Sequence, residues 1–190
     1  MSVRGRARGI PKDPVKLWLD MSEDPAWVYT EANAFPLSPV NGQRCFRTDI
    51  RGGMLFRYNA SLGYWLSDQL FTDTLTSFAS ITATTGYYWA PSSDYDLWLT
   101  RAICAVFQTT TGAVNFFVAT IGKRTPANAN TNIWTQSFTA ITVNTWTAYD
   151  SVLAYLLQPS SHPILAIDLT ETGASTIHGA IGISYRLRAV

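Results

Sequence analysis

The stretch TIHGAIGISYRL, residues 176–187, decides the fold class because apolar and polar side chains alternate along its whole length. One set of alternate positions holds Ile177, Gly179, Ile181, Ile183, Tyr185 and Leu187. The other set, which extends one residue beyond the stretch to Arg188, holds His178, Ala180, Gly182, Ser184, Arg186 and Arg188. A repeat of two residues is that of a β-strand with one face in a core, so the stretch predicts a long sheet strand.

Shorter strand-like segments recur upstream of this stretch, with glycine, proline, asparagine and serine between them. They are residues 87–90, 95–107, 114–121, 132–138 and 163–169. Such spacing predicts an all-β fold, with an antiparallel, jelly-roll-like β-sandwich over residues 72–190. Residues 95–107 are apolar on both alternating faces, which predicts a central strand covered on both sides. Residues 151–158 (SVLAYLLQ) form the one plausible helix, and their shortness leaves a strand as the alternative.

Two smaller regions precede the predicted sandwich. Residues 1–40 contain five prolines and no sustained period, which predicts an extended N-terminal arm with at most one helical turn. Residues 41–71 hold three apolar, aromatic runs separated by Arg51-Gly52-Gly53 and by residues 59–63. This pattern predicts a small three-stranded β-meander with tight turns.

The charge content is low for a free-standing globular protein. Charged residues make up 14% of the chain, whereas about a quarter is usual for a soluble monomer. From Ser61 to Val190 there are five basic and seven acidic residues in 130. We therefore expect neighbouring subunits to cover much of the surface, in a homo-oligomer with closed symmetry such as a trimer.

The basic residues gather near the N-terminus, beginning with Arg4, Arg6 and Arg8. These three arginines could bind nucleic acid or be solvated, but docking onto an acidic partner subunit is the favoured interpretation. Gly5, Gly9 and the prolines interrupt this region, so it does not have the apolar run of a signal peptide. No window approaches 18 consecutive apolar residues, and no membrane partner is expected. We expect synthesis in a host cytoplasm.

The sequence suggests neither catalysis nor a metal or cofactor site, so a non-enzymatic protein is expected. His162 lies in a Ser-Ser-His-Pro turn and His178 on the polar side of the last strand, without the local pattern of a catalytic triad. Asp94 and Asp96 could form a calcium corner, but a polar turn is favoured because more oxygen ligands are needed. Cys45 and Cys104 are expected to be free, small hydrophobes.

The seven tryptophans raise an alternative function, that of a carbohydrate-binding adhesin for host-surface glycans. Trp65 and Trp98 fall within strand patterns and are expected to be buried. Aromatic residues nearer to turns are the candidates for stacking on sugars: Tyr87, Tyr88, Trp89, Trp134 and Trp146.

Residues 39–71 carry a motif that is similar to a module of phage and prophage virion proteins. It contains Gly-x-Arg-x-Phe-x-Thr-Asp, then a glycine, an aromatic-x-Tyr-Asn turn and Trp-Leu-Ser. The matching residues are Gly42, Arg44, Phe46, Thr48, Asp49, Gly53, Phe56, Tyr58, Asn59, Trp65, Leu66 and Ser67. The chain departs from the pattern by an extra residue or two at 50–53 and by a longer turn at 59–63, so binding residues in these loops are not carried over.

The resemblance implies a bacteriophage virion structural protein, because such modules precede a threonine- and aromatic-rich sandwich in tail fibres, tail tips or head decorations. It implies other capsid or tail proteins as partners, the virion as location, and no catalytic residues. Within the module, we expect Asp49 to satisfy backbone N–H groups before a turn, and Gly52 or Gly53 to adopt a positive φ. Tyr58 and Trp65 are expected to pack across adjacent strands.

Overall fold

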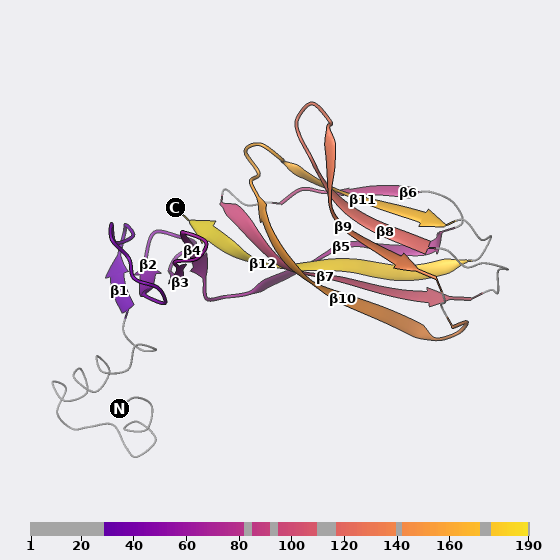
Figure 1. Ribbon diagram of the computed structural model, residues 1–190, viewed down its shortest axis with the longest axis horizontal. Helices are drawn as coiled ribbons and strands as arrows, with labels where there is room; N and C mark the ends of the chain where they lie inside the picture. Colours follow the sequence, from indigo (N-terminus) through magenta and orange to yellow (C-terminus); the bar gives the residue numbers. More distant parts are fainter. Residues whose placement is uncertain are drawn as a thin grey trace, which may run out of the picture. The chain divides into compact units, whose positions relative to one another are not determined.

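Twelve β-strands and no helix make up the part of the chain that the computed structural model describes, namely residues 29–81, 85–91, 95–109, 117–139, 142–171 and 176–189 (Figure 1). The chain forms two compact units, the first ending at Gln69 and the second running from Leu70 to Arg188. Arg4, Arg6, Arg8 and Asp94 lie outside the described residues.

The second unit is a sandwich of two four-stranded sheets (Figure 1). Its strands are β5 (Phe71–Ile81), β6 (Thr85–Trp89), β7 (Asp96–Gln108), β8 (Phe117–Arg124), β9 (Asn130–Phe138), β10 (Trp146–Leu157), β11 (Ile164–Glu171) and β12 (Ile177–Ala189). The spatial orders are β5-β12-β7-β10 and β6-β11-β8-β9, and all neighbours are antiparallel. This is the strand order of an eight-stranded jelly roll, which confirms the predicted fold class.

The core of the sandwich lies between the facing sides of the two sheets. Alternation in β12 is as predicted, because Ile177, Ile181 and Ile183 are fully buried while the intervening side chains are more exposed, apart from Ser184. The ring of Phe117 lies 5.7 Å from that of Phe78 and so joins the two sheets. Burying each such side chain contributes about 1.5–3 kcal/mol, which makes this interior the main source of stability.

Strand β7 changes its alternation partway along because of a β-bulge. Opposite β12, Arg101 pairs with Ser184 and Leu99 with Tyr185, so Thr100 has no partner position. The Thr100 hydroxyl instead donates a hydrogen bond to the Ser184 carbonyl at 3.0 Å. As a result, Leu97 and Leu99 share the inner face with Ala102, Cys104 and Val106.

This bulge corrects two expectations about residues 95–107. Strict alternation placed Leu97 and Leu99 with Ile103, Ala105 and Phe107, but the extra residue at Thr100 separates these two groups onto opposite faces. The strand is central in its sheet, yet it is not covered twice, since the outer side chains are partly exposed. The second apolar face of β7 is therefore a half-exposed surface.

Of the two alternatives for residues 151–158, the strand is confirmed and the helix is wrong. These residues belong to β10, whose backbone pairs with β7 from Trp146 to Leu157. Leu153 and Leu157 are buried while Val152 and Ala154 are exposed, so the segment has the burial pattern of a strand. The strand β5 was not among the predicted segments, because threonine and serine fill most of its outer positions.

The first unit contains β1 (Tyr29–Ala32), β2 (Arg44–Arg47), β3 (Met54–Asn59) and β4 (Tyr64–Ser67). The last three form the predicted antiparallel meander. Strand β1 pairs in parallel with β2, so residues 29–32 are part of a sheet rather than of an extended arm. Gly52 and Gly53 have φ values of 76° and 120°, which confirms that the first turn needs the left-handed region.

Candidate functional site

The outer side of β12, β7 and β10 forms a surface that we call the apolar face. Residues that are opposite each other in a sheet project to the same side. The strand register therefore defines rows of side chains that run across this surface. The rows are His178-Phe107-Trp146, Ala180-Ala105-Ala148, Gly182-Ile103-Asp150 and Ser184-Arg101-Val152. Small side chains fill the row Ala180-Ala105-Ala148, which allows another backbone or sheet to approach closely there.

The hydrophobic side chains of this face are open to solvent. Val152 is 88% exposed and Trp146 is 62% exposed, and the Trp146 ring packs against Phe107 at 5.4 Å. Ile103 and Ala105 are half-buried. A surface of this kind is typical of the centre of a protein–protein contact, where charged residues are depleted and aromatic residues enriched.

The two charges in these four rows neutralise each other, and Arg186 lies beyond them on the same side, in the row Arg186-Trp98-Leu156. The Arg101 guanidinium donates from Nε to Oδ1 of Asp150 at 2.5 Å, and from Nη2 to Oδ2. This side-chain hydrogen bonding lowers the pKa of Asp150 and raises that of Arg101. The bidentate pair leaves the centre of the face without net charge, so two copies of it would not repel each other.

The outer side of β6, β11, β8 and β9 forms a second surface, the polar face. Its register gives the rows Tyr88-Ala166-Gly122-Asn132, Gly86-Asp168-Thr120-Thr135 and Ile164-Arg124-Asn130. Amide, hydroxyl and carboxylate groups are thus arranged around the small residues Ala166 and Gly122. Hydroxyl and amide groups both donate and accept hydrogen bonds, so this face can bind a partner rich in polar groups.

Tyr88 is the exposed aromatic residue of the polar face and lies on its edge strand β6. It is 63% exposed, and the Arg124 guanidinium lies 5.1 Å from its ring centroid. Arg124 also donates from Nη1 to Oδ1 of Asn128 at 2.6 Å. Among the described residues its buried Nε has no hydrogen-bond partner, so its donors are incompletely used.

The other predicted stacking residues do not gather around Tyr88. Tyr87 and Trp89 alternate with Tyr88 and point to the inner side of β6, where Trp89 lies 6.5 Å from the Tyr185 ring. Trp134 is only 8% exposed, so the expectation of an exposed Trp134 is wrong. Trp146 is exposed but belongs to the apolar face, on the other sheet.

The sequence reasoning missed Arg101, Asp150, Arg124 and Asp168. Arg101 and Asp150 are 49 positions apart, so no local pattern connects them. A signal for the polar face does exist, because asparagine occurs at every second position in ANANTN, residues 127–132. In a strand, that spacing places successive amides on one face.

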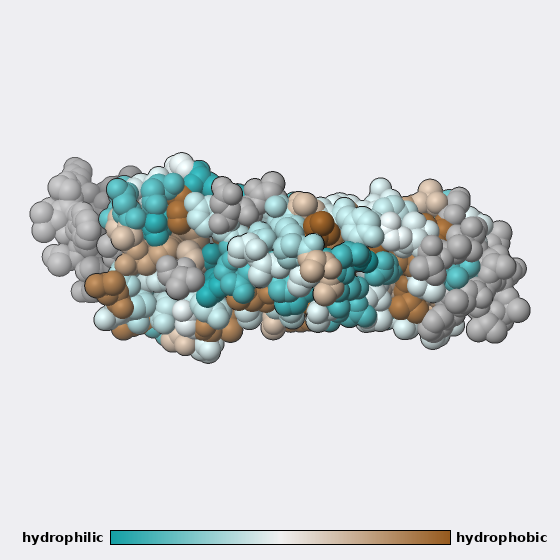
Figure 2. All heavy atoms as spheres, turned by 90° about the horizontal axis from the view of Figure 1, so that it is seen from above, coloured by the Kyte–Doolittle hydropathy of each residue, from teal (hydrophilic) through white to brown (hydrophobic). Residues whose placement is uncertain are grey.

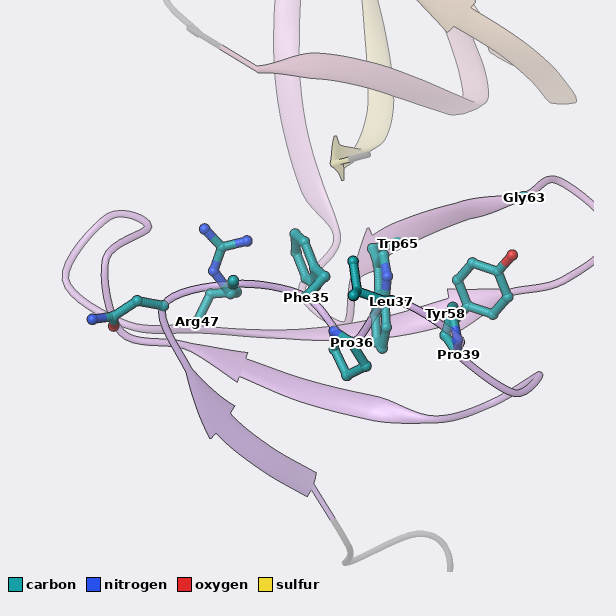
Figure 3. A pocket seen from close by; sticks show the side chains of 10 residues that line it. Phe35, Pro36, Leu37, Pro39, Arg47, Tyr58, Gly63 and Trp65 are labelled. Carbon is teal, nitrogen blue, oxygen red and sulfur yellow. The ribbon is translucent and has the colours of Figure 1, made fainter.

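In the first unit, a pocket of about 500 Å³ is lined by aromatic and proline side chains (Figure 3). Phe35 stacks on Trp65 at 4.8 Å, and Tyr58 packs on Trp65 at 5.4 Å across β3 and β4, which confirms the expected Tyr58–Trp65 contact. The Arg47 guanidinium lies 4.3 Å over the Phe35 ring. Leu37, at the same pocket, is completely exposed. The cluster thereby fixes the segment after β1 onto the meander.

Asp49 and Gly53 shape the turn after β2. Arg47 donates two hydrogen bonds to the Asp49 carboxylate, at 2.8 and 2.7 Å, and this contact lowers the pKa of Asp49. The main partner of Asp49 is therefore the Arg47 side chain, and a backbone hydrogen bond at Asp49 itself contributes less to the lowered pKa. A Cβ atom at Gly53 would lie 2.7 Å from Cζ of Phe46, so any side chain there would collide with this ring.

Asp96 and His162, two of the described residues considered for catalysis or metal binding, each have local partners. Asp96 accepts a hydrogen bond from Nη1 of Arg188 at 2.5 Å, and His162 lies in a turn next to Ser161. Within the described ranges, no cluster of three or more histidine, cysteine or acidic residues could hold a metal ion. Cys45 and Cys104 are buried and free, and burial raises the pKa of Cys104 to about 12.

Exposed hydrophobic residues are scattered over the molecule. Figure 2 shows one side, where they lie as separate brown patches among pale and teal residues. The large ones are Leu37, Val40, Leu70, Tyr88, Trp146, Tyr149 and Val152. In the part of the chain that the structure covers, no helix has the length and hydrophobicity to cross a membrane.

No protein-family model and no curated protein matches the chain. Among solved structures it is similar to the VP2 subviral particle of infectious bursal disease virus, with 9% identity, a TM-score of 0.42 and coverage of 80% of this chain and 40% of that one. A CBM22-1 xylan-binding domain of Paenibacillus barcinonensis Xyn10C gives 11% identity and a TM-score of 0.38, over 67% and 87% of the two chains. The chain thus spans about two fifths of the VP2 chain, and similarities this low assign no function.

Proposed function

We propose that the chain is a non-enzymatic structural protein of a bacteriophage particle. It assembles on the particle surface, as a capsid decoration or as a tail or fibre component. The observation that supports this proposal is the apolar face, a row of small and apolar outward side chains with one internally neutralised ion pair. The jelly roll is a recurrent fold of viral capsid proteins, although the fold alone does not define a function.

The occupant of the apolar face is a second copy of the same chain. Identical faces without net charge can meet without repulsion, whereas a strongly charged partner would find no complementary charge there. The rows built from Ala105, Ala148 and Ala180 let two sheets pack closely, and Val152 and Trp146 supply apolar area at the contact. Contact between two identical faces is isologous, so it closes as a twofold-symmetric dimer.

The assembly proposal is tested by measuring molar mass by light scattering over a range of protein concentrations. We expect an oligomer for the native chain and a monomer for Val152→Lys, because the lysine would place unpaired charges in the contact. Val152 is 88% exposed, so this change should leave the fold intact. Ser137→Lys adds the same charge to the polar face and should leave the oligomer unchanged. A folded native chain that stays monomeric at tens of micromolar would refute the proposal.

Docking through the N-terminal arm, which includes Arg4, Arg6 and Arg8, is the second part of the proposal. Deleting residues 1–16 is expected to leave the jelly roll folded but to prevent incorporation into particles. Incorporation is measured by separating assembled particles from free protein and quantifying the chain in each fraction. Normal incorporation of the shortened chain would show that residues 1–16 are not needed for docking, and the apolar face would then be the element responsible for assembly.

A further inference from the structure

We infer that the polar face binds an uncharged, hydroxyl-rich sugar chain through a site centred on Tyr88. The site comprises Tyr88, Arg124, Asn130 and Asp168, and we call it the tyrosine ledge. It lies on the opposite sheet from the apolar face, so an assembled particle would still present it. Binding at the ledge does not depend on assembly.

The aromatic ring provides the surface for stacking. Tyr88 is the one large hydrophobic side chain that is exposed on the described parts of β6, β8, β9 and β11. Arg124 covers only part of it, since the residue remains 63% exposed. The electron-rich face of a tyrosine attracts the weakly positive C–H groups on the apolar side of a sugar ring. The exposed Tyr88 ring therefore offers a pyranose an apolar surface for stacking, which a surface of polar side chains alone lacks.

The polar groups around the ring suit hydroxyl groups. Asp168 pairs in register with Gly86 and with Thr120, so its carboxylate projects beside the Tyr88 row. On the other side, Asn130 is opposite Arg124 in the register, and its amide lies over Gly122. A carboxylate accepts from hydroxyls, an amide does both, and a guanidinium donates, which together satisfy the mixed donors and acceptors of a sugar.

The charge of the ledge favours neutral sugars over acidic ones. Asp168 and Arg124 contribute one charge of each sign, so no excess positive charge is present to attract uronate or sialate groups. Arg124 is already engaged by the Tyr88 ring and by Asn128, at 5.1 Å and 2.6 Å respectively. A protein partner fits less well, because the face lacks the cluster of apolar side chains that forms the centre of protein contacts.

A single exposed aromatic residue predicts weak binding per site, with a dissociation constant of roughly 0.1–1 mM. Many copies on one particle would raise the apparent affinity by about 10²–10⁴-fold without new contacts. The ledge would therefore hold a particle on a glycan-coated surface although one chain alone dissociates quickly. This gain in apparent affinity rests on the proposed assembly function, whereas binding at one site does not.

The test uses the full chain on an array of neutral and acidic oligosaccharides, followed by calorimetric titration of the best neutral oligosaccharide. We expect binding to neutral glycans, retention in Tyr88→Phe, and at least a tenfold loss in Tyr88→Ala. Trp146→Ala is the matched control on the other sheet and should keep the affinity measured by titration, although weaker assembly would lower its signal on the array. A thermal melt of each variant shows that the fold is retained.

Several results would overturn the proposal. They are an array on which no neutral glycan binds, a preference for acidic glycans, undiminished binding by Tyr88→Ala, or loss of the affinity measured by titration in Trp146→Ala instead. The monomeric variant Val152→Lys separates this proposal from that of assembly. It should keep the affinity measured by titration while losing apparent affinity on the array. A monomeric native chain that still binds through Tyr88 would refute assembly and leave the ledge intact.

Discussion

The two outer faces of the jelly roll share one architecture but have opposite chemistry. Each is the outward side of a four-stranded antiparallel sheet. On one, the rows across three strands carry mainly alanine, glycine, isoleucine, valine, phenylalanine and tryptophan, with Arg101 and Asp150 paired to each other. On the other, asparagine, threonine, aspartate and arginine fill the corresponding outward positions. The backbone order therefore does not determine which partner a face accepts, and the outward residues do.

The exposed aromatic residue of each face illustrates this difference. Trp146 packs against Phe107, a hydrocarbon ring, and so enlarges an apolar area. Tyr88 lies against the Arg124 guanidinium and so belongs to a polar cluster. Each is about three-fifths exposed, at 62% and 63%, so exposure alone would rank them equally. Their neighbours distinguish a protein contact from a site for a polar ligand.

The largest expected effect comes from a change that damages both faces at once. A Cβ atom at Gly179 would lie 2.2 Å from the Ala105 carbonyl oxygen, which is backbone and cannot move aside. Gly179→Ala should lower the free energy of unfolding by about 2–3 kcal/mol, as overpacking does. Urea denaturation measures this loss.

Cys104 provides a second measurement on the same variant. Burial raises its pKa to about 12, so the thiol stays protonated and unreactive in the native fold at pH 8. Faster modification by a thiol reagent in Gly179→Ala would show that the two sheets separate more readily. A variant with native stability and native reactivity would mean that β12 and β7 can shift apart without cost.

A more selective change affects the apolar face alone. Asp150→Asn removes the carboxylate that neutralises Arg101, which leaves an unpaired positive charge in each copy of the face. We expect the dissociation constant of the oligomer to rise roughly tenfold, while glycan binding at the ledge is unchanged. Sedimentation at several concentrations measures the association. An Arg101→Met, Asp150→Leu double variant has no charge to leave unpaired and should associate at least as well as the native chain.

Acid should act on the same pair, but only at low pH. Arg101 holds the pKa of Asp150 below its ordinary value of 3.8. The carboxylate therefore stays charged from neutral pH down to pH 3.8. The contribution of the pair to association is present above the lowered pKa of Asp150 and is lost as the pH falls through that pKa. Association measured by light scattering should therefore persist at pH 4.5 and weaken at still lower pH. A fall in association already between pH 7 and pH 5 would contradict a role for this pair.

The smallest expected effect on stability is on the polar face. A Cβ atom at Gly122 would lie 2.2 Å from Oδ1 of Asn130, the same overlap as at Gly179 but with the end of a side chain. The Asn130 amide can swing away, so Gly122→Ala should change the free energy of unfolding by no more than about 0.5 kcal/mol. Affinity for the neutral oligosaccharide should fall, because the displaced amide leaves the ledge. A loss of stability equal to that of Gly179→Ala would show that Asn130 is held rigidly.

The strands with regular alternation could be predicted from the sequence. For residues 176–187 both the strand and its buried face could be predicted, because alternation with a period of two over twelve residues is typical of a half-buried strand. Strand β5 was not identified, because threonine and serine at positions such as 72, 74 and 77 are also typical of loops. Only the pairing of these residues with β12 shows that they belong to a strand. The apolar run at 151–158 fits either a helix or a strand, and only its pairing with β7 decides between them.

The candidate surfaces could be predicted only in part. Tyr88 and Trp146 were identified as aromatic residues near turns, but Trp134 is covered because it projects, with its register partner Ile121, to the buried inner side of the sheet. The Arg101–Asp150 pair joins strands that are distant in the sequence, and its formation depends on the sheet order. Which aromatic residues share a face is set by the register, and the bulge at Thr100 altered that register where strict alternation was assumed.

The bulge at Thr100 also determines how β7 can vary among related chains. Thr100 occupies the one position without a partner on β12, so many replacements of its side chain could be accommodated. Deleting its codon would join Leu99 directly to Arg101, so that Leu99 would stay inward, Arg101 outward and Ala102 inward in strict alternation. Loss of any other single residue of β7 would turn the strand beyond it inside out, so a length change in this strand among related chains should fall at position 100.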